Sequence, residues 1–365
     1  MQKTLKTLIV ISLLFSGAAK AAEEDTLRLL FSQVPAQYVQ SMTTAQFATI
    51  FLKSARSIDA NLQVADDNDK ISVYYRGRLV KSLYKPQNDD DADGWSELGG
   101  KILDLVLHNS AVAAKHDFEL IDLMMADTVK SLDKDSKYYS GMENAEKRLP
   151  HRRNFSARMD GDNLYLKIGV FNNFSVADIR GALAEYPQHQ GIIMDLRASP
   201  GGQLGTAVEV ADLFLDEGII ASVRGRNPNE VTYYSAKDGD VASNKPLVVL
   251  VDGQTSSAAE VLTAALQEQS RAKVVGTRSY GKGTIQNLLK LPNGGTLSLS
   301  GEYLYTPSGA KLAETGVVPD ICTYEMPENK DVSKLISAGK DENCGRESRS
   351  DSALEPEIAA ILLKM

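Results

Sequence analysis

The amino-acid sequence predicts an α/β protein with a mostly helical N-terminal region. Between about residues 163 and 324, short apolar runs alternate with segments of helical period. This alternation is typical of a βαβ core with buried, near-parallel strands. Upstream, apolar residues recur at helical spacing, as at Ile102, Leu105 and Val106. With 365 residues, 43% of them hydrophobic and 24% charged, the chain has a globular composition and room for two domains.

The chain divides into four expected parts that differ in composition. The first has the features of a secretory signal: two lysines, a short apolar run and an Ala-Lys-Ala site ending at Ala21. The apolar run is too short to span a bilayer, so we expect cleavage and a periplasmic or secreted protein, with an uncleaved anchor as the alternative. An integral membrane protein is not expected. The parts are a signal peptide at 1–21, a mostly helical region at 22–160, the α/β core at 161–325 and a polar extension at 326–365.

Each part has its own candidate elements. In the helical region, the segment 71–75 alternates like a strand and is the exception. In the core, apolar runs predict strands at 164–170, 191–195, 247–251, 273–275 and 297–299. Helical spacing predicts helices at 176–185, 204–215 and 257–269. The polar extension is expected to be loosely packed and to end in a short apolar helix at 355–364.

The charge pattern argues against two classes of function. The formal net charge is −8 and the sequence shows no basic stripe, so a nucleic acid is not an expected partner. Asp89, Asp91 and Asp93 match the start of a calcium-binding loop, but Gly100 stands where a bidentate glutamate is needed. A solvated acidic linker is the preferred interpretation, and no metal or other cofactor is expected.

Two cysteines, Cys322 and Cys344, are compatible with an oxidising compartment. They would form one disulfide bond if they pair. Two separate buried thiols are the alternative, because pairing does not follow from sequence.

Ser257 lies where a catalytic serine would benefit from its surroundings. It follows the predicted strand 247–251 and a turn, and it precedes a helix with a clean apolar face. The start of a helix offers free N–H groups and the positive end of the helix dipole. Ser257 and Glu260 also form the Ser-x-x-Glu capping box of ordinary helices, and this fragment alone favours the cap.

A serine nucleophile needs a base, and lysine is the best candidate here. The four histidines, His108, His116, His151 and His189, stand in helical, linker or turn contexts typical of structural residues. Lys282 is framed by glycines that permit close backbone approach. An exposed lysine is almost wholly protonated at pH 7, because its ordinary pKa is about 10.4, so this role requires surroundings that disfavour the ammonium form.

Two glycine-rich segments each allow more than one interpretation. Residues 276–282 match a phosphate-binding Gly-x4-Gly-Lys loop, but Gly283 replaces the hydroxyl residue that should hold Mg²⁺, so nucleotide binding is disfavoured. Gly201 and Gly202 follow the predicted strand 191–195 and precede a helix. They could form a nest of N–H groups for an oxyanion, or an ordinary tight turn.

Together these segments resemble the C-terminal processing peptidases, a family of Ser–Lys proteases with a crotonase-like fold. The matching segments are GIIMDLRASPGGQ, KPLVVLVDGQTSSAAEVLTAALQEQSRAKVVGTRSYGKGTIQ and YTPSGAKLAETGVVPDI. The resemblance covers about residues 163–321, and weakly 132–140. It implies an α/β peptidase core of the crotonase-like ββα type.

The resemblance also implies roles for individual residues. Ser257 corresponds to the nucleophile, Lys282 to its general base and Gln286 to a residue that orients the lysine in some members. The oxyanion donors correspond to the backbone N–H groups of Ala258 and of Gly201 or Gly202. The expected site is Ser257, Lys282, Gln286, Gly201, Gly202 and Ala258.

The sequence departs from the family at one place. Members usually carry a PDZ domain between the segments that correspond to 132–140 and 163 onward, where this chain has only 22 residues, too few for a domain. The expected function is an exported serine endopeptidase that lacks this module and acts on protein or peptide substrates. An activating or adaptor protein is left open as a further partner. The alternative is a non-catalytic binding or scaffold protein on the same fold.

Overall fold

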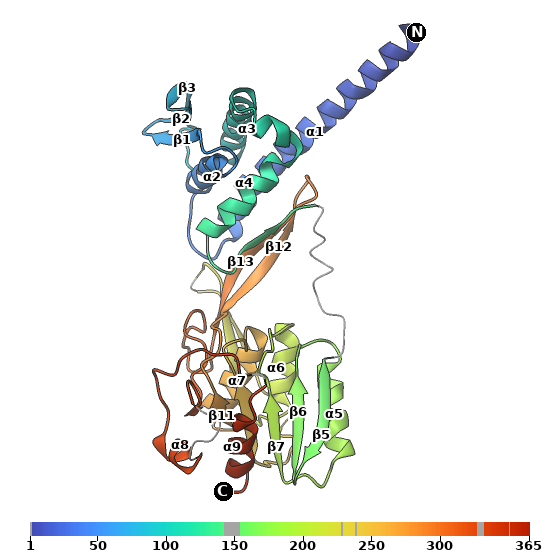
Figure 1. Cartoon of the computed structure of the whole chain (residues 1–365), viewed down its shortest axis with the longest axis vertical. Coiled ribbons are helices and arrows are strands. Elements are labelled where there is room, and N and C mark those ends of the chain that lie inside the picture. The colour runs from blue at the N-terminus through green and yellow to red at the C-terminus, as the bar shows by residue number, and fades with distance from the viewer. Residues whose placement is uncertain (1, 142–153, 228, 238, 327–331, 350) are drawn as a thin grey trace. The chain divides into compact units, whose positions relative to one another are not determined.

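The computed structural model describes residues 2–141, 154–227, 229–237, 239–326, 332–349 and 351–365, except for the side chains of residues 2–19 and 118. The described chain forms two compact units. The N-terminal unit contains residues 2–141 and Gln286–Gly301, and the α/β unit contains residues 154–285 and 302–365. Figure 1 shows both. Most of the predicted signal peptide falls in residues whose side chains lie outside this description, as does His151 altogether.

The N-terminal unit is mostly helical, as predicted. Its helices are α1 (Gln2–Gln37), α2 (Thr44–Lys53), α3 (Ala92–Asn109) and α4 (Leu120–Thr128). Aromatic side chains join α1 to α2, because Phe31 packs edge-on against Phe47 and Phe51 with ring centroids 5.9 and 5.7 Å apart. Asp91 caps α3 by accepting a hydrogen bond from the Gly94 N–H at 3.0 Å. The acidic stretch is therefore a solvent-exposed loop, as predicted, that continues into the first turn of α3.

The N-terminal unit also contains more strand than the sequence indicated. The predicted strand at 71–75 is the middle strand of an antiparallel sheet, β1 (Leu62–Asp67), β2 (Lys70–Tyr75) and β3 (Arg78–Tyr84). Its neighbours were missed because their outer residues are exposed and polar, which obscures the alternation. A further short strand, β4 (Lys137–Tyr139), pairs with residues 296–298 of the long strand β13 (Thr296–Tyr305).

The α/β unit is built on a six-stranded sheet in the order β14-β11-β10-β7-β6-β5. All neighbouring pairs are parallel except β5–β6, which confirms the expected near-parallel core. The strands are β5 (Phe155–Asp160), β6 (Asn163–Ile168), β7 (Gly191–Asp195), β10 (Leu247–Val251), β11 (Lys273–Gly276) and β14 (Ile321–Cys322). The predicted α/β class with a mostly helical N-terminal region is therefore correct.

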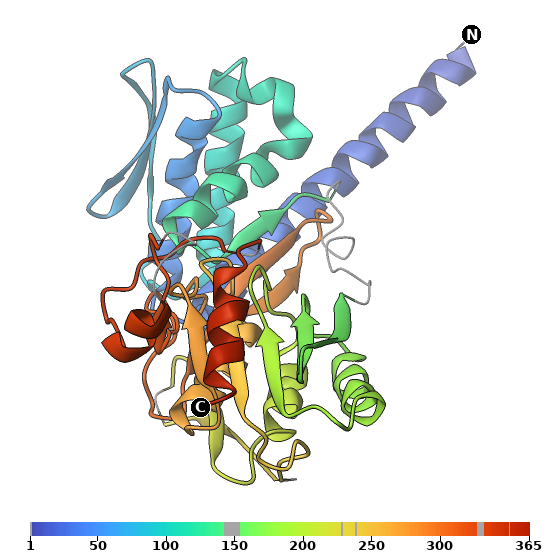
Figure 2. The ribbon, with the colours of Figure 1, turned by 60° about the horizontal axis from the view of Figure 1, so that its bottom comes forward.

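Both faces of this sheet are buried, which explains its continuous apolar strands. On one face, Ile192, Met194 and Val249 pack in a core with α5 (Ser175–Glu185), α6 (Leu204–Asp212) and α7 (Ala258–Glu268). On the other face, the alternate residues Ile193 and Val248 pack against α9 (Leu354–Leu362) and Leu335 of α8 (Val332–Ala338). Figure 2 shows α9 lying across this second face.

The remaining strands of the described chain form a third sheet. Its α/β-unit part pairs β8 (Ile219–Arg224) antiparallel with β9 (Val231–Ser235) and with residues 303–305 of β13 (Thr296–Tyr305). The predicted strand at 297–299 is thus a short part of a ten-residue strand. Strand β12 (Thr284–Lys290) neighbours β13 in the same sheet.

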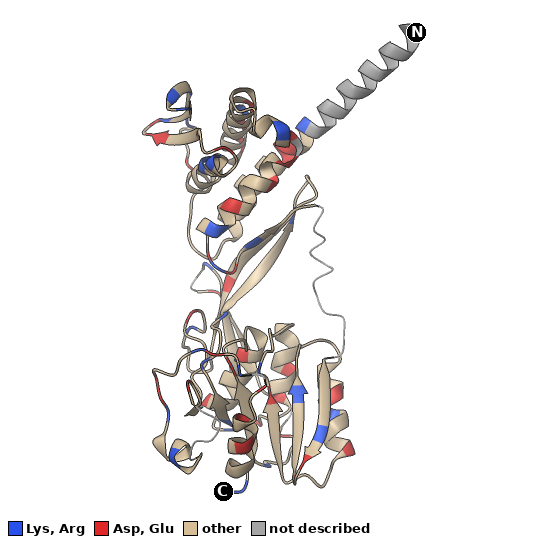
Figure 3. Cartoon of the chain, in the orientation of Figure 1, with Lys and Arg blue, Asp and Glu red and all other residues tan. Residues whose placement is uncertain are grey.

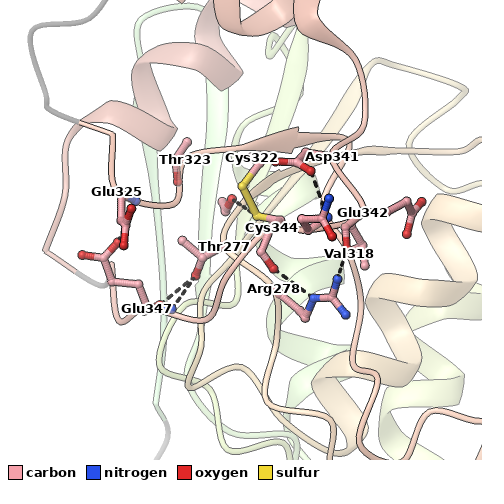
Figure 4. Close-up of a disulfide and its surroundings, with 12 residues drawn as sticks. Thr277, Arg278, Val318, Cys322, Thr323, Glu325, Asp341, Glu342, Cys344 and Glu347 are labelled. Atoms are coloured by element: carbon pink, nitrogen blue, oxygen red, sulfur yellow. Dashed lines mark hydrogen bonds between the residues drawn. A yellow bond between two sulfur atoms is a disulfide. The ribbon is translucent and has the colours of Figure 1, made fainter.

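The described part of the C-terminal extension is packed instead of loose, although its composition is polar. Helix α9 begins one residue before the predicted start and ends two residues before the predicted end, and Leu354 and Ile358 are buried against the sheet. Cys322 and Cys344 form a disulfide bond, which resolves the alternative left by the sequence (Figure 4). In the view of Figure 3, charged residues of both signs are interspersed over the α/β unit.

Candidate active site

Ser257 stands in a tight turn between β10 and α7. Its backbone has φ 58° and ψ −124°, a left-handed conformation that non-glycine residues rarely adopt and that clusters at functional sites. Buried side chains shape the turn: Asp252 Oδ1 accepts the Thr255 N–H at 3.1 Å, and the Thr255 hydroxyl donates to the Leu196 carbonyl at 2.9 Å. The turn therefore presents Ser257 in a strained, well-supported conformation.

The carboxylate of Glu260 is the centre of the site. The residue is fully buried. Its Oε2 accepts the backbone N–H groups of Ser257 at 2.7 Å and of Lys282 at 2.9 Å. Its Oε1 accepts the Gly281 N–H at 2.6 Å and the Ser279 hydroxyl. Burial raises the pKa of Glu260 above its ordinary value, and these hydrogen bonds oppose the rise.

The sequence had suggested only part of this role. The Ser-x-x-Glu pattern predicts that Glu260 reaches back to Ser257, and that bond is present. Its bond to Lys282 joins residues far apart in the chain, and no pattern in the sequence signals it. Glu260 is therefore a site residue that sequence reasoning missed.

Lys282 lies in the segment between β11 and β12, where its flanking glycines are sterically required. Gly281 has φ 79°, and a Cβ there would lie 2.9 Å from the carbonyl carbon of Glu314. A Cβ on Gly283 would lie 2.0 Å from the Ala313 nitrogen. The Glu314 N–H also donates to the Gly281 carbonyl at 2.9 Å. The close backbone approach inferred from Gly-Lys-Gly is therefore real, and its partner is the segment 313–314.

The Pro-Gly-Gly turn lies directly against the serine turn. A Cβ on Gly201, whose φ is 89°, would lie 2.6 Å from the Ser256 carbonyl oxygen and 2.8 Å from the Ala258 nitrogen. The Ser256 N–H donates to the Ser199 carbonyl at 2.9 Å, which ties the two turns together. Ala258 begins α7, so its N–H belongs to the first turn, which lacks intrahelical acceptors.

Gly202 has a different environment from Gly201. Its φ is 144°, and a Cβ there would lie 2.2 Å from the carbonyl oxygen of Phe171. The Gln203 N–H donates to that same carbonyl at 3.0 Å. This bridge positions the start of α6 and the turn that precedes it.

These turns share one location in the fold. They follow β7, β10 and β11, which are parallel neighbours, so they meet at the carboxyl edge of the sheet where open α/β folds bind ligands. The α/β unit thus brings together five of the six predicted residues. Gln286, in β12, is counted with the N-terminal unit, and its role stays a prediction.

The described histidines have structural surroundings. His189 is buried, contacts the Tyr186 carbonyl through Nδ1 and precedes β7, at the opposite edge of the sheet from Ser257. His108 and His116 belong to the N-terminal unit, where His108 Nδ1 contacts the Asp104 carbonyl of its own helix. This agrees with the sequence-based preference for lysine as the base.

A buried ion pair supports the strand that leads to the Pro-Gly-Gly turn. Arg197 donates to both oxygens of Asp195, from Nε at 3.0 Å and from Nη2 at 2.9 Å. Burial would raise the pKa of Asp195, but Arg197 and Lys167 hold it below its ordinary value. Burial and the nearby Asp195 raise the pKa of Tyr165 to about 12.

Comparison with known proteins assigns this core to a family. The model of peptidase family S41 matches residues 162–323, which include Ser257, Lys282 and the turns around them. Residues 162–323 form an S41 peptidase domain.

Several relatives of the S41 domain are carboxyl-terminal-processing proteases. The carboxy-terminal-processing protease of Bartonella bacilliformis is 38% identical over 178 residues, which are 47% of this chain and 41% of that protein. The carboxyl-terminal-processing protease of Synechocystis sp. is 33% identical over 158 residues, 43% of this chain and 36% of that protein. A solved photosystem II D1 C-terminal processing protease matches with 28% identity and a TM-score of 0.41, covering 51% of this chain and 47% of that one.

The similarity to these relatives covers only part of each protein. Each match just described spans less than half the length of the relative. The relatives come from bacteria and chloroplasts. In the described part of this chain, no helix has the length and apolar character needed to cross a membrane.

Proposed function

We propose that the protein is a serine endopeptidase in which Ser257 is the nucleophile and Lys282 the general base. The observation that carries the proposal is the shared carboxylate of Glu260, which binds the backbone of both residues. A nucleophile and its base must be held in fixed relative positions, because small misplacements cost large factors in rate. The S41 assignment supports the same chemistry.

The first half of the reaction forms an acyl-enzyme. The neutral amine of Lys282 takes the proton of the Ser257 hydroxyl while Oγ attacks the scissile carbonyl carbon. The resulting oxyanion accepts hydrogen bonds from the N–H groups of Ala258 and of Gly201 or Gly202. When the intermediate collapses, the C–N bond breaks and the Lys282 ammonium gives its proton to the leaving amine. The product is an ester between the substrate acyl group and Ser257.

The second half releases that acyl group. Lys282, neutral again, takes a proton from a water molecule as the water attacks the ester carbonyl. The same N–H groups stabilise the second oxyanion, and the proton then passes to Ser257 as the carboxylic acid leaves. Gln286 is proposed to orient the lysine amine as a neutral partner, because a carboxylate would favour the ammonium form.

The context of the enzyme is proposed from the sequence. The lysines near the start, the apolar run and the Ala-Lys-Ala site support export to the periplasm or beyond, and the substrates are then envelope or exported proteins. The 22 residues between 140 and 163 support recognition of substrates without a PDZ domain at that place. An activating or adaptor protein is a further proposed partner.

The test is cleavage of unfolded casein by the purified protein. Wild type should degrade casein, and both Ser257→Ala and Lys282→Ala should be inactive while they keep wild-type circular dichroism. Ser256→Ala is the matched control, because Ser256 is the adjacent hydroxyl, and it should stay active. Casein that remains intact with folded wild-type protein would favour the non-catalytic alternative. Activity of Ser257→Ala would assign the nucleophile to another residue.

A further inference from the structure

The chain returns to the candidate site after the S41 domain ends. Residues 341–349, called here the C-terminal strap, lie beyond the matched residues 162–323. The Cys344–Cys322 disulfide joins the strap to β14 (Figure 4). At the other end, Arg349 Nε donates to Oε1 of Glu355, which is fully buried in α9, at 3.1 Å. The strap is therefore anchored on both sides.

Backbone groups of the strap bind the turns that precede Ser257 and Lys282. The Gly253 N–H donates to the Glu347 carbonyl at 2.6 Å, and the Thr277 hydroxyl donates to the same oxygen at 2.7 Å. The Arg278 N–H donates to the Gly345 carbonyl at 2.9 Å. Gly253 follows β10 and Thr277 follows β11. One short segment thus holds the turns that follow both strands.

Arg346 makes the most direct contact with the lysine segment. Its Nε donates to the Ser279 carbonyl at 2.7 Å. Its Nη2 donates to the carbonyls of Glu314 at 2.6 Å and Thr315 at 2.9 Å. The planar guanidinium can serve these acceptors together, which a single ammonium group cannot reproduce. Arg346 therefore joins the stretch just before Lys282 to the stretch packed against its flanking glycines.

The segment that Arg346 binds also contacts the carboxylate of Glu260. Ser279 is fully buried, and its hydroxyl donates to Glu260 and accepts the Val317 N–H at 2.7 Å. On the other side, the Glu314 N–H donates to the Gly281 carbonyl at 2.9 Å. Both stretches that Arg346 binds thus make direct hydrogen bonds to the groups around Lys282.

We propose that Arg346 is a positioning residue for Lys282, and that the C-terminal strap completes the S41 site from outside the matched domain. The inference rests on the proposed Ser–Lys mechanism. Without Arg346, the segment 279–283 gains freedom, so the lysine amine is less often within reach of the Ser257 hydroxyl. Water also reaches the amine more easily and favours its ammonium form. The attack of Ser257 on the substrate is then slower, while the affinity for the substrate is preserved.

The test compares Arg346→Ala and Arg346→Lys with wild type on a fluorogenic peptide, with kcat, KM and the pH profile as readouts. We expect Arg346→Ala to lower kcat by about tenfold or more, since slight misplacement of a catalytic group has effects of this order. KM should change less than about twofold, because the lost interaction acts on the chemical step. The rising limb of kcat/KM should move to higher pH. Arg346→Lys should recover part of kcat.

Two controls separate the possible failures. Lys340→Ala removes a nearby exposed cation that pairs with Glu342 and should behave as wild type. Lys282→Ala must be inactive; if it is active, the Ser–Lys mechanism itself fails. If Lys282→Ala is inactive but folded Arg346→Ala keeps the wild-type kcat and pH limb, only the positioning role is overturned. Should Arg346→Ala not fold, Arg346→Gln, which retains two N–H donors without the charge, replaces it in the same measurement, and the same outcomes support or overturn the positioning role.

Discussion

The backbone N–H groups of Ser257 and Lys282 donate to the same oxygen, Oε2 of Glu260, at 2.7 and 2.9 Å. Two residues on different turns thus share one buried acceptor. A buried carboxylate loses hydration and recovers that loss only through such hydrogen bonds, so any shift of either turn leaves a charge or an N–H group unsatisfied. A change in the relative position of Ser257 and Lys282 would therefore cost free energy.

Replacing Glu260 should therefore impair catalysis strongly. In Glu260→Gln, the amide NH2 group would face at least one backbone N–H donor whichever oxygen it replaces, so at least one hydrogen bond of the shared acceptor is lost. We expect kcat/KM to fall about a hundredfold or more, equivalent to about 2.7 kcal/mol. The measurement is steady-state cleavage of a fluorogenic peptide. Glu268→Gln, an exposed change in the same helix, should keep wild-type activity, and an active Glu260→Gln variant would contradict the positioning role of this carboxylate.

The pH profile should report a lysine base. Lys282 accepts the Ser257 proton only as a neutral amine, so kcat/KM should rise with pH through a single ionisation. Lys282→Arg should be inactive, because a guanidinium stays protonated. Gln286→Glu should move the rising limb to higher pH, because an added carboxylate favours the ammonium form. An active Lys282→Arg variant would exclude the lysine-base mechanism, and an unmoved limb in Gln286→Glu would remove Gln286 from the site.

A methyl group on Gly283 should disturb the lysine segment. The new Cβ would stand 2.0 Å from the Ala313 nitrogen, so the backbone must move. We expect Gly283→Ala to lose most of its activity and about 1–3 kcal/mol of unfolding free energy, as for other overpacking changes. Gly205→Ala is the matched control, because nothing lies within 4 Å of its Cβ and the residue is in α6. It should be as active as wild type and slightly more stable. Equal activity of the two variants would show that the close approach has no catalytic importance.

Removing the disulfide should destabilise the α/β unit. The bond closes a loop with a sequence separation of 22, for which the chain-entropy model gives about 3 kcal/mol. We expect the double variant Cys322→Ser/Cys344→Ser to lose about this free energy of unfolding in urea. A dithiol reductant should bring wild type to the same stability and leave the variant unchanged. Identical urea curves for oxidised wild type and variant would show that the bond contributes nothing.

Asp195 should make stability sensitive to acid. Its pKa is lowered in the folded state, so the folded protein binds fewer protons at this site than the unfolded chain. Its contribution is therefore complete above the ordinary value of 3.8 and is lost as the pH falls through the lower folded pKa. Asp195→Asn should be less stable at pH 7 by up to about 3–5 kcal/mol, because Arg197 loses one of its two carboxylate partners and keeps only Glu355, at 3.4 Å.

The difference in unfolding free energy between wild type and Asp195→Asn should then shrink as the pH falls below about 4, because the unfolded wild-type chain binds a proton at this site before the folded protein does. Thermal unfolding from pH 2 to 7 measures it. Asp162→Asn, at an exposed carboxylate, should follow wild type throughout. A constant difference down to pH 2 would mean that Asp195 is not the titrating group.

The sequence by itself determined the elements of the core and the identity of the candidate residues. Strands 191–195 and 247–251 have the predicted limits because both faces of the sheet are buried, which requires unbroken apolar runs. Gly281 and Gly283 signalled a close backbone approach because only glycine tolerates one. Apolar runs and glycines depend only on neighbouring positions in the chain, so they can be recognised in the sequence alone.

Only the tertiary structure decided what those residues contact. Glu260 looked like an ordinary capping residue, yet its carboxylate also holds Lys282, and this bond joins turns that meet only because β10 and β11 are neighbours. The polar segment 341–349 looked like part of a loose tail, yet Arg346 binds carbonyl groups beside Lys282. Every residue has a backbone carbonyl, so the sequence does not show which carbonyls a side chain will bind. A residue such as Arg346 is recognised only when the folded chain brings those carbonyls within hydrogen-bonding distance.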